Sequence, residues 1–295
     1  MKKRIIIHGA GNAGRVLAME IEHIFDIIAF IDRNKATIKS YSGTHFAGTP
    51  IYRHLDQAKD LEFDFILVTS GDFEGIQREY RNIYGVPENK LVNMRNGYQE
   101  GKRQLFYSLA NEIFRMETPG AVVELGVNYG DTAKYINFFF YDRTLYLFDT
   151  FEGFPKQGDL DFEKSAGVSP DRMAHFDDDR WMHLYDDGIT ERNLLRKMHY
   201  PEKCVIKKGV FPESLRGLEG NFAFVHIDCD FSKPIQAALE YFYPRLSPGG
   251  YICVHDYYHP IFSRVRVVVR EYAERNGVAL VPVPSYGGAV ITKIL

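Results

Sequence analysis

Acidic residues and a histidine follow two apolar segments in the C-terminal half of the chain. Asp228 and Asp230 end the run FAFVHIDCD, and His255 and Asp256 end the run YICVHD, with an amphipathic segment between the two runs. This order predicts strand, helix, strand, with Asp228 and Asp230 on one side of the first strand and Cys229 on the other. If the strands are parallel neighbours, about 4.8 Å apart, both polar ends lie at one carboxyl edge of the sheet. Carboxylates and an imidazole suit a divalent cation, although strand-end carboxylates can also simply cap the following helices.

A glycine-rich turn precedes this segment. The sequence ELGVNYG, from Glu124 to Gly130, places Gly126 and Gly130 between a predicted strand and a predicted helix. The next predicted strand, 144–148, ends at Asp149, 25 residues after Glu124. An acid at the end of the second strand suits a ribose diol, so the two features together predict an adenosine site. Because the spacing differs from the dinucleotide pattern, S-adenosylmethionine is the favoured ligand.

A second glycine-rich turn lies at the N-terminus. After the strand-like run RIIIH, the segment GAGNAG has the GxGxxG spacing, and a helix and a strand then lead to Asp32, 18 residues after Gly14. Glycines let the backbone approach a phosphate at the start of a helix, and an acid at this distance can accept from a ribose. We therefore expect a nucleotide or nucleotide-sugar to bind at Gly9, Gly11, Asn12, Gly14 and Asp32. The alternative is a tight turn in a domain that binds no ligand.

Composition narrows the class of protein. The chain has 295 residues, a formal net charge of -3, 45% hydrophobic and 25% charged residues, as in ordinary soluble globular proteins of about two domains. There is no basic patch for nucleic acid, and no apolar run of the roughly 18 residues that span a bilayer. Cys204, Cys229 and Cys253 lie in apolar runs without a metal-binding spacing, which predicts buried thiols in a reducing compartment. We expect a cytoplasmic protein that forms a homo-oligomer.

Polar residues 93–103 (NMRNGYQEGKR) predict a domain boundary. Residues 1–95 are expected to form a small Rossmann-like α/β domain with parallel strands at 4–8, 27–31, 63–69 and 91–92. Residues 100–295 are expected to form a larger α/β domain, in which a hairpin of strands 279–283 and 289–294 predicts an antiparallel last strand. Residues 150–200 contain Gly, Pro and acidic residues in an irregular pattern, which predicts a loop that covers the site.

Five segments together resemble the macrocin O-methyltransferase (TylF-like) family, whose members modify the sugars of antibiotics. They occur in the order VELGVNYGDTA, LFDTFEGFP, KGVFPESL, FVHIDCD and LSPGGYICVHDY, all within residues 100–295. The resemblance implies the class I methyltransferase fold, a Rossmann-like sheet of seven strands with an antiparallel last strand. It also implies S-adenosylmethionine as the methyl donor, a divalent cation (usually magnesium) and a sugar hydroxyl as the acceptor.

The resemblance implies roles for individual residues. Asp228 and Asp256 fall on metal-ligand positions, and Asp230 falls on the general base. Asp149 would bind the ribose of the donor. The other residues expected to contact the donor are Glu124, Gly126, Asn128 and Gly130 on the methionine side, and Gly209 and Phe211 near the adenine.

One position departs from the family pattern. The family commonly has two consecutive acids before a tyrosine, whereas this chain has His255 followed by Asp256. A neutral imidazole can bind a metal, and it shifts the preference toward softer ions such as manganese or zinc. Alternatively His255 is not a ligand, and the metal keeps an extra water or is lost.

The sequence leaves three functions open. The first is metal-assisted O-methylation of a sugar, with a nucleotide-sugar, a surface-glycan precursor or a natural-product sugar as the acceptor. The second is a nicotinamide-dependent oxidoreductase, which would leave the turn at Glu124–Gly130 unexplained and lacks a Tyr-x-x-x-Lys pair. The third is a non-catalytic nucleotide-binding protein, against which the complete set of acids at the predicted sheet edge argues.

Overall fold

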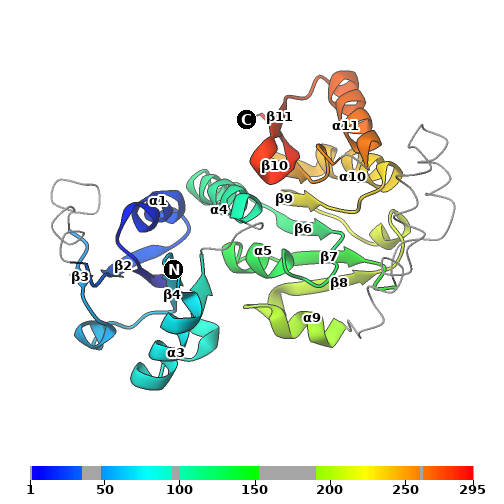
Figure 1. Ribbon diagram of the computed structural model, residues 1–295. Helices are drawn as coiled ribbons and strands as arrows, with labels where there is room; N and C mark the ends of the chain where they lie inside the picture. The colour runs from blue at the N-terminus through cyan, green and yellow to red at the C-terminus, as the bar shows by residue number, and fades with distance from the viewer. Residues whose placement is uncertain (1, 35–47, 95–99, 153–190, 260–261, 295) are drawn as a thin grey trace. The chain divides into compact units, whose positions relative to one another are not determined.

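The computed structural model describes residues 2–34, 48–94, 100–152, 191–259 and 262–294. The chain divides into two compact units, Met1–Arg115 and Met116–Leu295, and each contains one sheet (Figure 1). Helix α4 (Glu100–Arg115) falls in the first unit, where it packs against α1 (Asn12–Ile21). The sequence had assigned residues from 100 onward to the second domain, so the contacts within the chain place this helix differently.

The first unit is a parallel five-stranded sheet in the order β3-β2-β1-β4-β5. This confirms the small Rossmann-like domain. The strand β3 was not predicted, because two residues are too few to show a periodic pattern. The strands are β1 (Arg4–His8), β2 (Asp26–Ile31), β3 (Ile51–Tyr52), β4 (Phe65–Val68) and β5 (Leu91–Asn93), and helix α3 (Phe73–Tyr84) connects β4 to β5.

Alternation along the strands gives this sheet two apolar faces. Ile6 packs in one core cluster with Tyr80 of α3, whereas the neighbouring Ile7 lies beneath the start of α1, close to Gly14. All residues of β4 are buried, as expected for a central strand covered on both faces. The sheet therefore has its helices on both sides, and its carboxyl edge carries the turn from β1 into α1.

The second unit is a seven-stranded sheet in the order β11-β12-β10-β9-β6-β7-β8. The five strands from β10 to β8 are parallel, and β12 runs antiparallel to both of its neighbours. The predicted antiparallel strand near the C-terminus is confirmed. The strands are β6 (Ala121–Leu125), β7 (Leu145–Asp149), β8 (Cys204–Lys208), β9 (Phe222–Ile227), β10 (Leu246–Val254), β11 (Leu280–Val283) and β12 (Gly288–Thr292).

Helices α10 (Ser232–Arg245) and α11 (Ser263–Asn276) pack against each other and cover one face of this sheet (Figure 1). Their core cluster includes alternate residues of the central strands, such as Val225 and Ile227 of β9. The opposite face contacts α5 (Ala133–Phe139) and the residue after it, Phe140, whose ring lies 5.0 Å from that of Phe224. Gly277 ends α11 in the left-handed conformation, as the sequence Asn276-Gly277 predicted.

Most of the insert 150–200, which we expected to cover the site, falls in 153–190 and lies outside the described residues. All three cysteines are free, with Cys253 buried and Cys204 and Cys229 partly buried. Among the described helices, none combines the length and apolar character that crossing a bilayer requires.

Candidate active site

The central strands bring the predicted cluster together at the carboxyl edge of the second sheet. Strands β9 and β10 are parallel neighbours, and Val254 pairs with Ile227 at their ends. The backbone N–H of His255 continues this ladder by donating to the carbonyl of Ile227 at 2.9 Å. Asp228 and His255 therefore leave the sheet side by side, as the parallel arrangement predicted.

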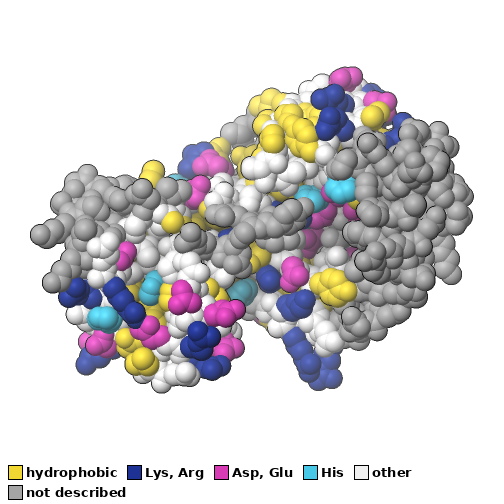
Figure 2. Space-filling view, in the orientation of Figure 1, with side chains coloured by type: hydrophobic (Ala, Val, Ile, Leu, Met, Phe, Trp, Pro, Cys, Tyr) yellow, Lys and Arg dark blue, Asp and Glu magenta, His cyan; other side chains and the backbone are white. Residues whose placement is uncertain are grey.

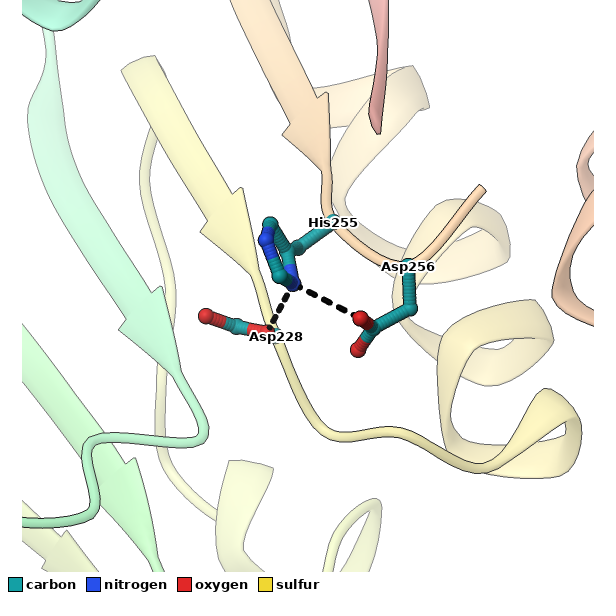
Figure 3. Close-up of side chains that lie close together, drawn as sticks. All are labelled: Asp228, His255 and Asp256. Atoms are coloured by element: carbon teal, nitrogen blue, oxygen red, sulfur yellow. Dashed lines mark ion pairs between the residues drawn. The ribbon is translucent and has the colours of Figure 1, made fainter. Parts of the chain in front are cut away.

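Three side chains converge at this edge (Figure 3). The Nδ1 atom of His255 lies 2.8 Å from Asp228 Oδ1 and 2.9 Å from Asp256 Oδ1. One potential ligand atom from each residue lies within 4.8 Å of the other two. Histidine and acidic side chains also gather on this unit in the space-filling view (Figure 2). Two carboxylates and an imidazole that point to one place form a donor set that fits a divalent cation.

The backbone after each strand is strained. Asp230 and Asp256 have φ angles of 63° and 59°, a left-handed conformation that costs a residue with a side chain about 1–3 kcal/mol and that clusters at functional sites. Strand β9 ends at Ile227, so the expected strand alternation of Asp228, Cys229 and Asp230 is wrong. A turn replaces it, in which the Phe231 N–H donates to the Cys229 carbonyl at 2.6 Å. The three residues are thereby placed by the turn and not by the pleat of a strand.

The cluster shifts the acid–base properties of its members. Burial alone would lower the pKa of His255, but the negative charges of Asp228 and Asp256 outweigh burial and raise this pKa to about 10. Burial raises the pKa of Asp230 well above its usual range, and the carboxylates of Asp256 and Asp228 raise it further. The site thus concentrates negative charge, which a bound cation would neutralise.

The turn after β6 lies directly beside this cluster. Asp149, at the end of β7, accepts hydrogen bonds at Oδ2 from the backbone N–H groups of Val127 and Asn128, both at 2.8 Å. A Cβ atom on Gly126 would lie 2.0 Å from the carbonyl oxygen of Asp228. The expected donor-binding turn therefore packs, backbone against backbone, on the segment that carries the cluster.

Glu124 has a partner that the sequence did not suggest. Its Oε1 lies 3.2 Å from His226 Nδ1, and both side chains are fully buried. Tyr286, in the turn between β11 and β12, places its ring 6.1 Å from that of His226 and 5.5 Å from that of His255. His226 precedes Asp228 by two residues in the run FVHID, a spacing that could have drawn attention to it; nothing in the sequence pointed to Tyr286.

The remaining residues expected at the donor have structural contacts. The position of a Cβ on Gly130 is filled by Leu194 of α9 (Glu191–Lys197), which explains why glycine is needed there. The Gly209 N–H donates to the carbonyl of Asp149 at 3.0 Å. Phe211 packs its ring against those of Phe148 and Phe242. These contacts order the loops that surround Asp149.

The N-terminal glycine turn is built in a similar way. Asp32, after β2, accepts a hydrogen bond at Oδ2 from the Ala10 N–H at 2.9 Å. Gly14 lies so close to the turn that a Cβ would be 1.8 Å from the carbonyl oxygen of Gly9, whereas a Cβ on Gly11 would meet no atom within 4 Å. The turn has the backbone of the dinucleotide pattern; Asn12 begins α1, and its side chain lies outside the described part of the chain.

Comparison with known proteins decides the identity of the second unit. The family model described as macrocin-O-methyltransferase (TylF) matches residues 100–283, well over half of the chain. The chain belongs to the macrocin O-methyltransferase family. A further model, described as C2185-like, N-terminal, matches residues 1–92.

Two named proteins have sequences similar to this member of the macrocin O-methyltransferase family. Mycinamicin III 3''-O-methyltransferase of Micromonospora griseorubida is 24% identical over 272 residues, which cover 85% of this chain and 90% of the relative. The 8-demethyl-8-(2,3-dimethoxy-alpha-L-rhamnosyl)-tetracenomycin-C 4'-O-methyltransferase of Streptomyces olivaceus is 28% identical over 184 residues, covering 55% of this chain and 60% of the relative.

Solved structures confirm the fold. The O-methyltransferase NovP matches with a TM-score of 0.51 and 20% identity, over 66% of this chain and 81% of that chain. The calicheamicin methyltransferase CalS11 matches with a TM-score of 0.51 and 19% identity, over 68% and 80%. The seven-stranded sheet is thus that of class I methyltransferases, and the protein is an S-adenosylmethionine-dependent O-methyltransferase.

Proposed function

We propose that this protein transfers a methyl group from S-adenosylmethionine to a sugar hydroxyl with the help of a divalent cation. Both named relatives carry O-methyltransferase names, and one name specifies a rhamnosyl group. The observation that carries the cation is the convergence of Asp228, His255 and Asp256 within 4.8 Å beside the turn that starts at Gly126. A nicotinamide-dependent oxidoreductase is not favoured, since family membership assigns this turn to methyl transfer.

The cation would be held by the carboxylates of Asp228 and Asp256 and by the imidazole of His255. When bound, a divalent cation polarises a hydroxyl group and makes it a better nucleophile. The oxygen ligands suit magnesium, and the imidazole makes manganese acceptable as well. His255 thereby takes the place of the first of the two consecutive acids in the usual family pattern, and three potential ligands remain.

Asp230 is the proposed general base. In the reaction the sugar oxygen forms a bond to the methyl carbon, the bond from that carbon to the donor sulfur breaks, and the hydroxyl proton goes to Asp230. The products are the methyl ether and S-adenosylhomocysteine. Asp230 interacts electrostatically with Asp256 and Asp228, so the proposed base lies beside two residues that would hold the cation.

The donor is proposed to lie along the turn from Glu124 to Gly130, with its ribose at Asp149. Three backbone N–H groups, of Val127, Asn128 and Phe151, donate to the carboxylate of Asp149. These bonds fix the carboxylate at the end of β7 and keep the turn in one conformation before the donor arrives. Gly209 and Phe211 would border the adenine.

The test is a methyl-transfer assay on the full chain with S-adenosylmethionine and a panel of nucleotide-sugars and free glycosides. We expect at least one sugar acceptor to be methylated, with activity lost on addition of a chelator and restored by Mg²⁺ or Mn²⁺. Donor binding without any methylated sugar in a broad panel would contradict the acceptor class. Full activity in the presence of the chelator would contradict the role of the cation.

We infer that the N-terminal unit binds a nucleotide or the nucleotide portion of a nucleotide-sugar acceptor. The support is the turn Gly9–Gly14, in which Asp32 accepts from the Ala10 N–H at the carboxyl edge of a parallel sheet. Backbone N–H groups at the start of α1 can bind a phosphate, and Asp32 can accept from a ribose. Such an acceptor would be an activated sugar or a precursor of a surface glycan.

A further inference from the structure

Beneath the proposed donor site, a buried acid and a buried histidine lie on adjacent strands. Glu124 and His226 are partners in the ladder between β6 and β9, and neither side chain is exposed. The neighbours of His226 along β9, Val225 and Ile227, belong to the apolar cluster under α10 and α11. Glu124 and His226 therefore face the other side of the sheet, next to the turn that begins at Gly126.

The two nitrogens of the His226 ring point to the two proposed ligand sites. Nδ1 lies 3.2 Å from Oε1 of Glu124, the first residue of the turn Glu124–Gly130 at which the donor is proposed to bind (the donor turn). Nε2 lies 3.8 Å from Asp228 Oδ2, the carboxylate whose other oxygen lies 2.8 Å from His255. One imidazole ring thus bridges the first residue of the donor turn and a ligand of the proposed cation.

Stability alone does not account for this pair. A buried contact between a carboxylate and an imidazole contributes little net stability, because removing both groups from water costs about as much as their attraction returns. Residues that hold metal ligands and catalytic groups in place commonly contact them from behind, and His226 does so by a hydrogen-bond contact to Glu124 and a longer electrostatic contact, 3.8 Å, to Asp228. The aromatic ring of Tyr286, near both His226 and His255, further restricts where the two imidazoles can move.

We propose that His226 is a positioning residue that serves both sites: Nδ1 holds Glu124 beneath the donor, and Nε2 holds Asp228 toward the cation. This inference rests on the proposed function, since it assumes that both ligands bind. His226 contacts neither ligand itself in this arrangement. Its effect on each is transmitted through one carboxylate.

Two substitutions separate the two contacts. In His226→Asn the amide nitrogen occupies roughly the place of Nδ1, so the contact with Glu124 is kept and the contact with Asp228 is lost. In His226→Gln the longer side chain places its amide near Nε2 and gives up the contact with Glu124. Binding of Mn²⁺ and of S-adenosylhomocysteine to the full chain is measured separately by calorimetry, together with the melting temperature.

We expect opposite effects from the two variants. His226→Asn should weaken Mn²⁺ binding about 10- to 100-fold and leave S-adenosylhomocysteine binding unchanged. His226→Gln should weaken S-adenosylhomocysteine binding by at least about fivefold, because it removes the Nδ1 contact from the buried carboxylate of Glu124, and should leave Mn²⁺ binding unchanged. His54→Asn, which changes an exposed histidine of the first unit, should alter neither affinity.

Other outcomes overturn the inference. If both variants weaken both affinities in parallel with the melting temperature, His226 only supports the fold. If neither variant changes either affinity, the ring does not act on the ligands. A wild-type protein that binds S-adenosylhomocysteine but not Mn²⁺ would also overturn the proposed role of the cation, whereas the first two results leave that role intact.

Discussion

The carboxylate of Asp149 lies 2.8 Å from the backbone nitrogen of Asn128, a residue in the left-handed conformation with φ of 48°. The same oxygen also accepts from Val127, so Asp149 fixes the backbone of the turn Glu124–Gly130, where the donor is proposed to bind. In Asp149→Asn the side chain has only one acceptor oxygen, and the NH₂ group of its amide repels the backbone N–H groups that face it. We expect S-adenosylhomocysteine to bind about 10- to 100-fold more weakly by calorimetry, since hydrogen bonds to charged groups are the stronger ones.

The matched control for this change is Asp142→Asn. Asp142 lies just before β7, is about half exposed, and its Oδ1 lies 3.6 Å from Arg143 Nε. This substitution should leave donor binding unchanged. Equal losses of affinity in both variants would show that Asp149 does not organise the turn.

Removing one charge from the cluster of Asp228, His255 and Asp256 should weaken binding of the proposed cation without weakening binding of the donor. In Asp228→Asn the proposed cation loses a charged ligand, so we expect methyl transfer to fall by at least about 100-fold and Mn²⁺ binding to weaken. Donor binding should persist. Glu240→Gln, which removes an exposed acid paired with Arg275 at 3.1 Å on the α10–α11 side, is the control and should keep full activity. Turnover of Asp228→Asn near that of the wild type would refute the cation site.

The close approach of Gly126 to the backbone of Asp228 predicts that a side chain at position 126 destabilises the protein. A Cβ on Gly126 would lie 2.0 Å from a backbone oxygen, at φ of 87°, whereas a Cβ on Gly217 would meet nothing within 4 Å at φ of 74°. Alanine at either site has the strain of the left-handed backbone, but only Gly126→Ala adds a clash. We expect its free energy of unfolding in urea to fall about 1–3 kcal/mol further than that of Gly217→Ala. Equal losses would show that the two segments separate easily.

Much of this fold follows from the sequence because its strands are buried. Runs such as RIIIH and FAFVHI end abruptly at glycines or acids, so their bounds could be placed within a residue or two, and the pair Asn276-Gly277 marked the end of α11. Helix α4 was predicted as a helix, but its packing against α1 was not. Contacts of this kind have no signature in a periodic pattern.

The site was predictable where it depends on strand ends and not where it depends on tertiary packing. Asp228, His255 and Asp256 meet because parallel strands end at one edge. Asp230 departs from strand alternation because its left-handed backbone is set by the turn into α10. Tyr286 reaches the histidines from a hairpin 60 residues after His226, and only the antiparallel return of β12 brings it there.

Burial of His199 predicts how the second unit responds to acid. Burial, together with a smaller effect of the positive charge of Lys134, lowers the pKa of His199 to about 4. Between pH 6.5 and 4 the unfolded chain then binds a proton that the folded chain does not, so stability is full above pH 6.5 and falls with decreasing pH. We expect His199→Phe to remove up to about 3 kcal/mol of this loss, measured by urea unfolding at pH 7.5 and 4.5.

The exposed His54 of the first unit provides the control for that experiment. His54→Gln should leave the acid dependence of the second unit as in the wild type. If His199→Phe shows the same loss between pH 7.5 and 4.5 as the wild type, His199 is not the group that responds to acid.

Substitution of Gly11 in the N-terminal turn should leave the fold intact but interfere with the binding of a phosphate. A Cβ on Gly11 would meet no protein atom within 4 Å, whereas one on Gly14 would collide with Gly9. Gly11→Ala should therefore fold normally and place a methyl group where a phosphate would approach the start of α1. We expect calorimetry with UDP-glucose and NAD⁺ to show binding of at least one probe to the wild type and an affinity about tenfold lower in the variant. Gly48→Ala, an exposed glycine with equally open surroundings, should bind as the wild type does, while equal binding by Gly11→Ala, or no binding of either probe to the wild type, would count against a nucleotide site.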